Sequence, residues 1–191
     1  MTEKTPYVKR NISNINMLPL HSYIFPEKIS DKRSNMRLSC ANVSIYSEQL
    51  ENFPERDFDI ITAIDVIEHI STPVSFMEAA KDLLKPGGYI LLYTPNFDSF
   101  SIRVMRECSA IIGIGHVILF NHVSVAKLGQ LSGLEIIHTE TRGLDIHSIL
   151  FFQEYLGEKR NAFLVRWLDE LQAMIDGSGA ADYIRVIYRK P

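Results

Sequence analysis

The sequence predicts an α/β fold with a mostly parallel sheet. The main evidence is the segment Asp57–Asn96, in which an amphipathic helix separates an apolar strand at Phe58–Ala63 from a second at Tyr89–Tyr93. Both strands are too continuously apolar to have a solvated face, which is typical of parallel strands covered on both sides. A further observation is that no glycine precedes Gly87. A Gly-rich phosphate-binding loop therefore cannot lie upstream of this unit.

Composition limits the class of protein and of partner. The 191 residues are 46% hydrophobic, enough for one core of ordinary size. A net charge of −3 gives no electrostatic reason to expect a nucleic acid or a membrane as partner. No apolar run is long enough to span a bilayer, and no apolar signal region follows the N-terminal lysines. We therefore expect a cytoplasmic protein with a small-molecule partner.

Two regions are expected along the chain. Residues 1–36 are rich in Asn, Ser, Lys and Pro, follow no clear period, and are interpreted as an atypical N-terminal segment. Residues 37–191 are expected to form the α/β domain, which begins with a short strand at Val43–Tyr46.

The helix of the central unit has clear boundaries in the sequence. Ser71 and Thr72 offer N-cap hydroxyls, and Pro73 suits the first helical position because its missing N–H has no helical partner there. The Lys85–Gly88 turn is expected to end it.

The remainder of the chain predicts further helices and strands. Helices are expected from Asp98 to about Ile111 and at Val123–Leu131, and strands at Leu134–Thr139 and Tyr183–Tyr188. A helical insertion covers residues 145–176. One stripe of this insertion is apolar and is interpreted as a packing face, made of Phe163, Leu164, Trp167, Leu168, Leu171 and Ile175.

The cluster that carries chemistry is Asp65, Glu68 and His69. On a helical turn, positions i, i+3 and i+4 share one face, so these side chains are expected to lie together. Two carboxylates and an imidazole are suitable ligands for Mg²⁺, Mn²⁺ or Zn²⁺. A structural alternative is that Glu68 and His69 only cap the next helix. Without a metal, His69 is a candidate general base because imidazole titrates near neutral pH.

Four stretches in linked order resemble class I S-adenosylmethionine-dependent methyltransferases, in particular the ubiquinone O-methyltransferase branch. They are FDIITAIDVIEHI, LLKPGGYILLYTPN, HVILFNHVSVAKLGQLSGLEII and YIRVIYRK. The resemblance implies a Rossmann-like, doubly wound sheet that ends in an antiparallel strand, with Val43–Tyr46 as its third strand. It also implies methyl transfer from S-adenosylmethionine to an oxygen or nitrogen of a small acceptor.

The same resemblance implies the cofactor-binding residues. They follow the third strand and form the end of the fourth, and they are Ser47, Glu48, Ala63, Ile64 and Asp65. Residues Thr94–Asn96, at the carboxyl end of the next strand, are expected to line the substrate side. Within the insertion, Phe151, Phe152 and Tyr155 are candidates for lid aromatics, with core packing as the favoured alternative.

A divalent metal such as Mg²⁺ is a further implication. The D/E-x-x-E-H pattern at Asp65, Glu68 and His69 is similar to the metal motif of this branch, in which another histidine follows the fifth strand. His116 or His122 can take that place, and His122 is the predicted ligand. His69 and His122 are the predicted catalytic residues.

Two features of the family pattern are missing. The Gly-rich loop is absent, and Glu27 is the only remotely placed candidate for the acid that would bind the ribose. The N-terminal half is therefore interpreted as truncated or atypical, and the alternative function is a catalytically inactive remnant or partner subunit. Without a first strand, Phe58–Ala63 would have an open edge. We expect residues 1–36, a second copy or a partner chain to cover it.

Overall fold

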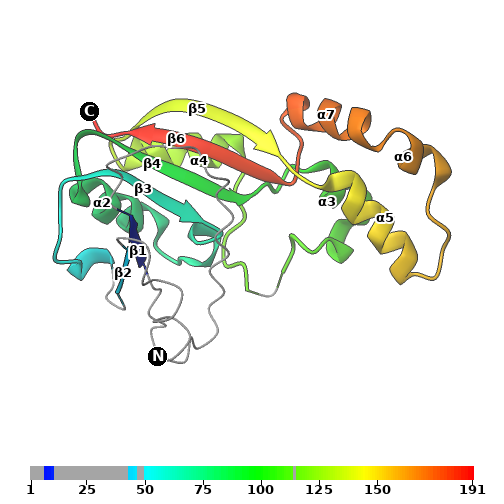
Figure 1. The fold of residues 1–191 in the computed structure, drawn as a ribbon, viewed down its shortest axis with the longest axis horizontal. Coiled ribbons are helices and arrows are strands. Elements are labelled where there is room, and N and C mark those ends of the chain that lie inside the picture. Colours follow the sequence, from blue (N-terminus) through cyan, green and yellow to red (C-terminus); the bar gives the residue numbers. More distant parts are fainter. Residues whose placement is uncertain (1–6, 11–42, 47–49, 114) are drawn as a thin grey trace. The chain divides into compact units, whose positions relative to one another are not determined.

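The computed structural model describes residues 7–10, 43–46, 50–113 and 115–191, drawn in colour in Figure 1. The chain divides into two units, Met1–Pro54 and Glu55–Pro191. The expected domain boundary, after residue 36, stays a prediction.

The N-terminal unit contains a two-stranded antiparallel sheet. Strand β1 (Tyr7–Arg10) pairs with β2 (Val43–Tyr46), with Tyr7 opposite Tyr46. A 3-10 helix, η1 (Leu50–Asn52), follows. The expectation that Val43–Tyr46 is a strand is confirmed, but its assignment to the main sheet is wrong because its ladder is made with β1. The proposed covering role of residues 1–36 falls largely outside the described residues, as does Glu27.

The C-terminal unit is built on a four-stranded sheet in the order β3-β4-β6-β5. Strands β3 and β4 are parallel, with Ala63 opposite Leu92, and β6 is antiparallel to both of its neighbours. The predicted parallel unit and the antiparallel last strand are therefore confirmed. The strands are β3 (Phe58–Ile64), β4 (Leu84–Pro95), β5 (Glu135–Arg142) and β6 (Tyr183–Arg189).

Two helices cover one face of this sheet. They are α2 (Pro73–Leu83), which connects β3 to β4, and α4 (His122–Leu131), and both lie behind the strands in Figure 1. Tyr188 of β6 is fully buried under α4 and donates its hydroxyl to the carbonyl of Val125. Pro73 occupies the first turn of α2 as predicted, but the hydroxyl of Thr72 makes no capping hydrogen bond.

The opposite face carries exposed apolar side chains. Ile60, Ile64 and Tyr89 are 48%, 40% and 40% exposed. The prediction that both faces of these strands are buried therefore holds only for the face under α2 and α4.

The helix expected from Asp98 to about Ile111 is shorter than predicted. Helix α3 is Phe100–Met105, and Ser99 rather than Asp98 is its N-cap, because the Ser99 side chain accepts from the amide of Ile102. The chain then tightens into η3 (Arg106–Cys108), where Arg106 has a positive φ of 53° that ends the α-helix.

The insertion forms three helices and not one. In Figure 1 they lie at the end of the sheet toward which β3 and β4 point. Asn161 caps the second helix, and the chain bends at Trp167 between the second and the third. The helices are α5 (Asp145–Tyr155), α6 (Ala162–Arg166) and α7 (Leu168–Ser178).

The apolar stripe of the insertion is less buried than predicted. Phe163 is 60% exposed, so the packing interpretation does not hold for it, and Trp167 is 41% exposed. The other four residues of the stripe are half-buried. The bend at Trp167 separates residues that a single helix would have aligned. Phe151 and Tyr155, for which core packing was favoured, are also exposed, at 70% and 79%.

A buried carboxylate pair connects the insertion to the sheet. Asp145 of α5 accepts from the backbone amides of Ser101 and Asp182, each at 3.1 Å, and from the side chain of Gln172. Asp182 accepts the hydroxyl proton of Ser101. Burial raises the pKa of Asp182 to about 6, and the neighbouring Asp145 carboxyl adds to the rise. The joint therefore places two carboxyl groups close together in a buried site.

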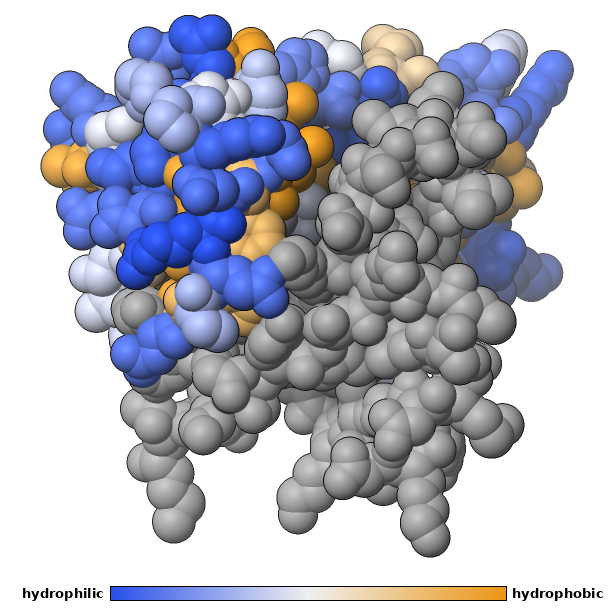
Figure 2. Space-filling view, turned by 60° about the vertical axis from the view of Figure 1, so that its left-hand side comes forward, coloured by the Kyte–Doolittle hydropathy of each residue, from blue (hydrophilic) through white to orange (hydrophobic). Residues whose placement is uncertain are grey.

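No helix in the described part of the chain is both long and apolar enough to cross a membrane. On the face shown in Figure 2, the residues coloured by hydropathy are mainly hydrophilic, and apolar side chains form small separate patches.

Candidate functional site

The candidate site begins where β3 ends. Asp65 takes a positive φ of 50°, a conformation that Asp tolerates better than most residues. Its amide donates to the carbonyl of Tyr93 at 3.0 Å, which continues the ladder between β3 and β4 by one step. The chain then turns into the 3-10 helix η2 (Ile67–His69). The helical turn expected to align Asp65 with Glu68 and His69 is therefore wrong, because Asp65 lies outside it.

Glu68 is the buried acid of the site. Its side chain is 1% exposed, and its Oε2 accepts from the hydroxyl of Thr94 at 3.0 Å. Its Oε1 is the only buried side-chain nitrogen or oxygen without a hydrogen-bond partner among the residues that the structure describes. Burial raises the pKa of this carboxyl, while the hydrogen bonds from the Glu68 backbone and from Thr94 oppose the rise. A buried carboxylate oxygen without a hydrogen-bond partner destabilises the folded state unless a ligand binds it.

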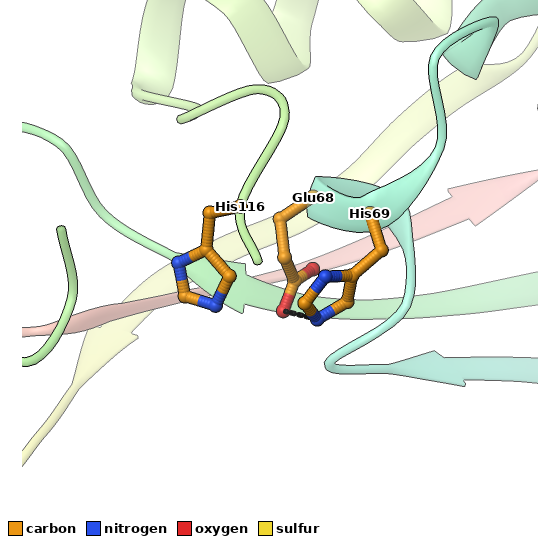
Figure 3. Close-up of side chains that lie close together, drawn as sticks. All are labelled: Glu68, His69 and His116. Carbon is orange, nitrogen blue, oxygen red and sulfur yellow. Dashed lines mark ion pairs between the residues drawn. The ribbon is translucent and has the colours of Figure 1, made fainter. Parts of the chain in front are cut away.

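Two histidines face this oxygen. The Nε2 of His69 lies 4.0 Å from Glu68 Oε1, and the ring of His116 contacts the ring of His69 edge to face, with centroids 5.0 Å apart. Figure 3 shows the His69 ring beside the carboxylate and the His116 ring approaching from a second segment. The three side chains thus converge from two parts of the chain.

Backbone carbonyls set the tautomers of both rings. The Nδ1 of His69 lies 2.7 Å from the carbonyl oxygen of Gly115, and the Nδ1 of His116 lies 2.7 Å from that of Ile111. A carbonyl only accepts, so each Nδ1 carries the proton and donates it. Each neutral ring therefore has its lone pair on Nε2, which is the arrangement of a metal-binding histidine with an outer hydrogen-bond partner.

The segment that carries His116 is held against η2 by its backbone. The carbonyl of Glu68 accepts from the amides of Val117 and Ile118, at 2.8 and 3.1 Å. Together with the bond from His69 to Gly115, these contacts connect two loops that are far apart in sequence. The position of His116 is therefore determined by main-chain hydrogen bonds rather than by side-chain packing alone.

The resulting donor set is suited to a divalent cation. One ligand atom from each of Glu68, His69 and His116 lies within 4.8 Å of the others, and no other such group of three occurs among the described residues. Asp65 is not a member of this cluster. It lies close enough for its charge to interact with both rings: partial burial raises its pKa, and His116 and His69 oppose the rise.

His122, the predicted fourth ligand, lies elsewhere. It is the first residue of α4, and Asn121 before it forms a reciprocal capping box with Ser124. Its Nε2 lies 3.1 Å from the carbonyl oxygen of Gly179, and it lines a pocket with Arg142 and Asp176. Of the two histidines that the sequence offered, the structure brings His116 and not His122 to Glu68 and His69.

The predicted cofactor residues are placed only in part. Ala63 is buried in β3, Ile64 ends that strand, and Asp65 follows it. Ser47 and Glu48 lie outside the described residues. For these five positions, cofactor binding stays a prediction.

The predicted substrate-lining residues, at the carboxyl end of β4, are buried. Thr94 and Asn96 are fully buried, and Asn96 donates to the carbonyl of Ala181 at 2.8 Å. Thr94 therefore supports Glu68, and Asn96 ties the end of β4 to the chain just before β6. β4 has a neighbouring strand on each side, so polar side chains at its end are expected to be buried and hydrogen-bonded to protein groups. This signal could have identified the structural role of both residues.

Comparison with known proteins decides the family. The methyltransferase-domain family matches residues 10–139, more than half of the chain. The chain belongs to this family. As the four motifs implied, it is a class I S-adenosylmethionine-dependent methyltransferase by descent, with the strand order and antiparallel last strand described above.

Several relatives of this methyltransferase-family chain share one name. A ubiquinone biosynthesis O-methyltransferase of Rhodopseudomonas palustris (strain TIE-1) is 28% identical over 151 residues, which cover 73% of this chain and 55% of that protein. Another, from Dinoroseobacter shibae, is 38% identical over 61 residues, or 32% of this chain and 23% of that protein. The chain thus spans about half the length of the curated relatives it matches.

A solved structure supports the fold. A methyltransferase of Thermotoga maritima superposes with a TM-score of 0.50 at 18% identity, covering 75% of this chain and 62% of that chain. At this identity the likeness shows the fold alone.

Proposed function

We propose that the protein transfers the methyl group of S-adenosylmethionine to a hydroxyl oxygen of a small acceptor. Family membership and the O-methyltransferase relatives support the reaction type. The observation that carries the choice of oxygen is the buried Oε1 of Glu68, which faces the imidazoles of His69 and His116. Such a donor set suits the activation of a hydroxyl group.

In this reaction the bond from the sulfonium sulfur to the methyl carbon breaks, and an oxygen–carbon bond forms. The sulfonium becomes a thioether, and the hydroxyl proton leaves to a base. Ala63, Ile64 and Asp65, with Ser47 and Glu48, are the proposed cofactor-binding residues. A position at the carboxyl end of parallel strands is where open α/β sheets bind such ligands.

Glu68, His69 and His116 would hold a divalent cation such as Mg²⁺. The fit rests on the unsatisfied carboxylate oxygen and on two Nε2 lone pairs whose rings are oriented by backbone carbonyls. When bound, the cation supplies positive charge that lowers the pKa of an acceptor hydroxyl. The three side chains would position that charge, and Asp65 lies close enough for its charge to interact with both imidazoles.

In the absence of a cation, His69 is the proposed general base. Its Nδ1 is already committed to Gly115, so Nε2 is the atom that takes a proton. His122 was the other predicted base, and its hydrogen-bond partner, Gly179, lies outside the cluster. A catalytic role for His122 stays a prediction without support from this geometry.

One observation favours a second candidate, an inactive methyltransferase-like subunit. No glycine precedes Gly87, and glycines normally allow the backbone amides to approach the cofactor closely. In this alternative the protein would act through a partner chain or a second copy. The proposed cytoplasmic location is common to both candidates.

Calorimetric titration of the whole chain with S-adenosylmethionine, and separately with its demethylated product, distinguishes the two. We expect saturable binding of both ligands and transfer of a labelled methyl group to a hydroxylated acceptor. No heat at about millimolar ligand, with no transfer, would favour the inactive subunit; this ligand range corresponds to a binding free energy of about −4 kcal/mol.

A further inference from the structure

We propose that Thr94 is a positioning residue that aims Glu68 at the cation. The inference rests on the proposed function, since it concerns the same donor set. The Thr94 hydroxyl donates to the carboxylate of Glu68, and Thr94 acts through that carboxylate.

The two carboxylate oxygens of Glu68 have different surroundings, and this difference supports the inference. Oε2 accepts the Thr94 hydroxyl proton at 3.0 Å, and Oε1 is left facing the His69 Nε2 at 4.0 Å. A carboxylate without this anchor can rotate about its last side-chain bond, because that torsion is broad. The hydroxyl removes this freedom and selects the orientation that presents Oε1 to the two rings.

Thr94 is itself held rigidly. It is fully buried on β4, where β3 pairs on one side and β6 on the other, and it lies opposite Ile184 of β6. Its branched β-carbon restricts the side chain to few rotamers. The neighbouring Tyr93 carbonyl also receives the Asp65 amide. Consecutive residues of β4 therefore fix both the backbone turn and the acid that follows it.

A merely structural role for Thr94 makes a different prediction. If the Thr94 hydroxyl only satisfied the buried Oε2 of Glu68, its loss would lower the stability of the fold and leave the affinity for the cation unchanged. A positioning role requires that cation affinity falls by more than the loss of stability explains. Outer partners of metal ligands typically contribute about 10–100-fold to metal affinity.

The test is Mn²⁺ binding to the whole chain, measured by calorimetry, for the wild type, Thr94→Val and Thr94→Ser. Valine keeps the shape without the donor, whereas serine keeps the donor. We expect Thr94→Val to weaken Mn²⁺ binding by about 10–100-fold and Thr94→Ser to restore it to within roughly threefold of the wild type.

Thr141→Val is the matched control. Thr141 is also buried, and its hydroxyl donates to the carbonyl of Asp176 at 2.8 Å, outside the cluster. We expect it to lose a similar hydrogen bond with Mn²⁺ affinity unchanged. If Thr94→Val does not fold by circular dichroism, Thr94→Cys, with a much weaker donor, is expected to show the same loss of affinity.

The outcomes separate the two proposals. If Thr94→Val binds Mn²⁺ with the same affinity as the wild type, the role of Thr94 is overturned and the cation site stands. Where the valine variant does not fold, the same result in Thr94→Cys leads to the same conclusion. Absence of Mn²⁺ binding in the folded wild type would overturn the cation site and this inference with it. Equal weakening in Thr141→Val would show that the effect is general destabilisation, and would also overturn the inference.

Discussion

The imidazole of His69 donates through Nδ1 to the carbonyl of Gly115, 2.7 Å away and 46 residues later in the chain. This bond joins the turn after β3 to the loop before α4, and it leaves Nε2 of His69 facing Glu68. The loop bond therefore determines which histidine completes the cluster, since His116 follows Gly115 directly.

The cluster predicts a contrast between two histidines. His116→Ala should weaken Mn²⁺ binding by at least about tenfold, because it removes one ligand of three, and ligand or outer-partner losses are of this size. His122→Ala is the control and should leave the affinity unchanged, because His122 lies at Gly179. Electron paramagnetic resonance of free Mn²⁺ measures both. The opposite ranking would return the ligand role to His122.

Glu68→Gln should abolish Mn²⁺ binding without unfolding the protein. The amide keeps an oxygen for the Thr94 hydroxyl and removes the charge whose burial is unfavourable. We expect the Tm, measured by circular dichroism during thermal unfolding, to lie within a few degrees of the wild-type Tm or above it. A large drop in Tm would mean that Glu68 is chiefly a structural residue.

The carboxylate pair predicts a pH-dependent stability. The pKa of Asp182 is about 6 in the folded protein, above its ordinary unfolded value, so the folded state keeps a proton that the unfolded state releases. The stability that this bound proton contributes to the folded state is fully present below the pKa of the unfolded state. It is lost as pH rises through the pKa of the folded state. Asp182→Asn, which stays neutral, should lack the dependence.

The readout is the Tm of both proteins across this window. Between about pH 4 and pH 7, the wild type should lose roughly 3 °C or more relative to Asp182→Asn. A difference in Tm that stays constant across the window would contradict the account of the Asp145–Asp182 joint.

The insertion predicts two different costs of truncation. Phe163→Ala should change the free energy of unfolding by no more than about 0.5 kcal/mol, because Phe163 is 60% exposed. Leu150→Ala in α5 should cost about 2–5 kcal/mol, because Leu150 is 3% exposed. Urea unfolding compares them. A cost for Phe163 as large as for Leu150 would restore the packing role that the sequence suggested.

Local patterns predicted the central unit well. The apolar strands around α2 and the Pro73 start are properties of short segments, and the parallel pairing of β3 and β4 follows from the helix between them. The pairing of β2 with β1 depends on residues more than thirty positions apart, and no short-range pattern specifies it.

The candidate site was predictable in composition but not in geometry. Glu68 and His69 were identified from their type and position after a strand. His116 and His122 were both candidates for the third member, and the sequence analysis chose His122. The choice depends on backbone bonds from Val117 and Ile118 to Glu68, which bring His116 to the cluster and leave no mark on side-chain patterning. A usable signal against His122 was present: Asn121 and Ser124 form a capping pair that commits His122 to the first turn of a helix.

The most direct test of the cation site is a crystal structure of the whole chain grown with Mn²⁺ and examined at the manganese absorption edge. We expect one anomalous peak roughly 2.0–2.3 Å from Glu68 Oε1 and from the Nε2 atoms of His69 and His116, distances usual for divalent ions. Electron density showing Glu68 Oε1 bonded to a protein group, with no peak between the two rings, would contradict it.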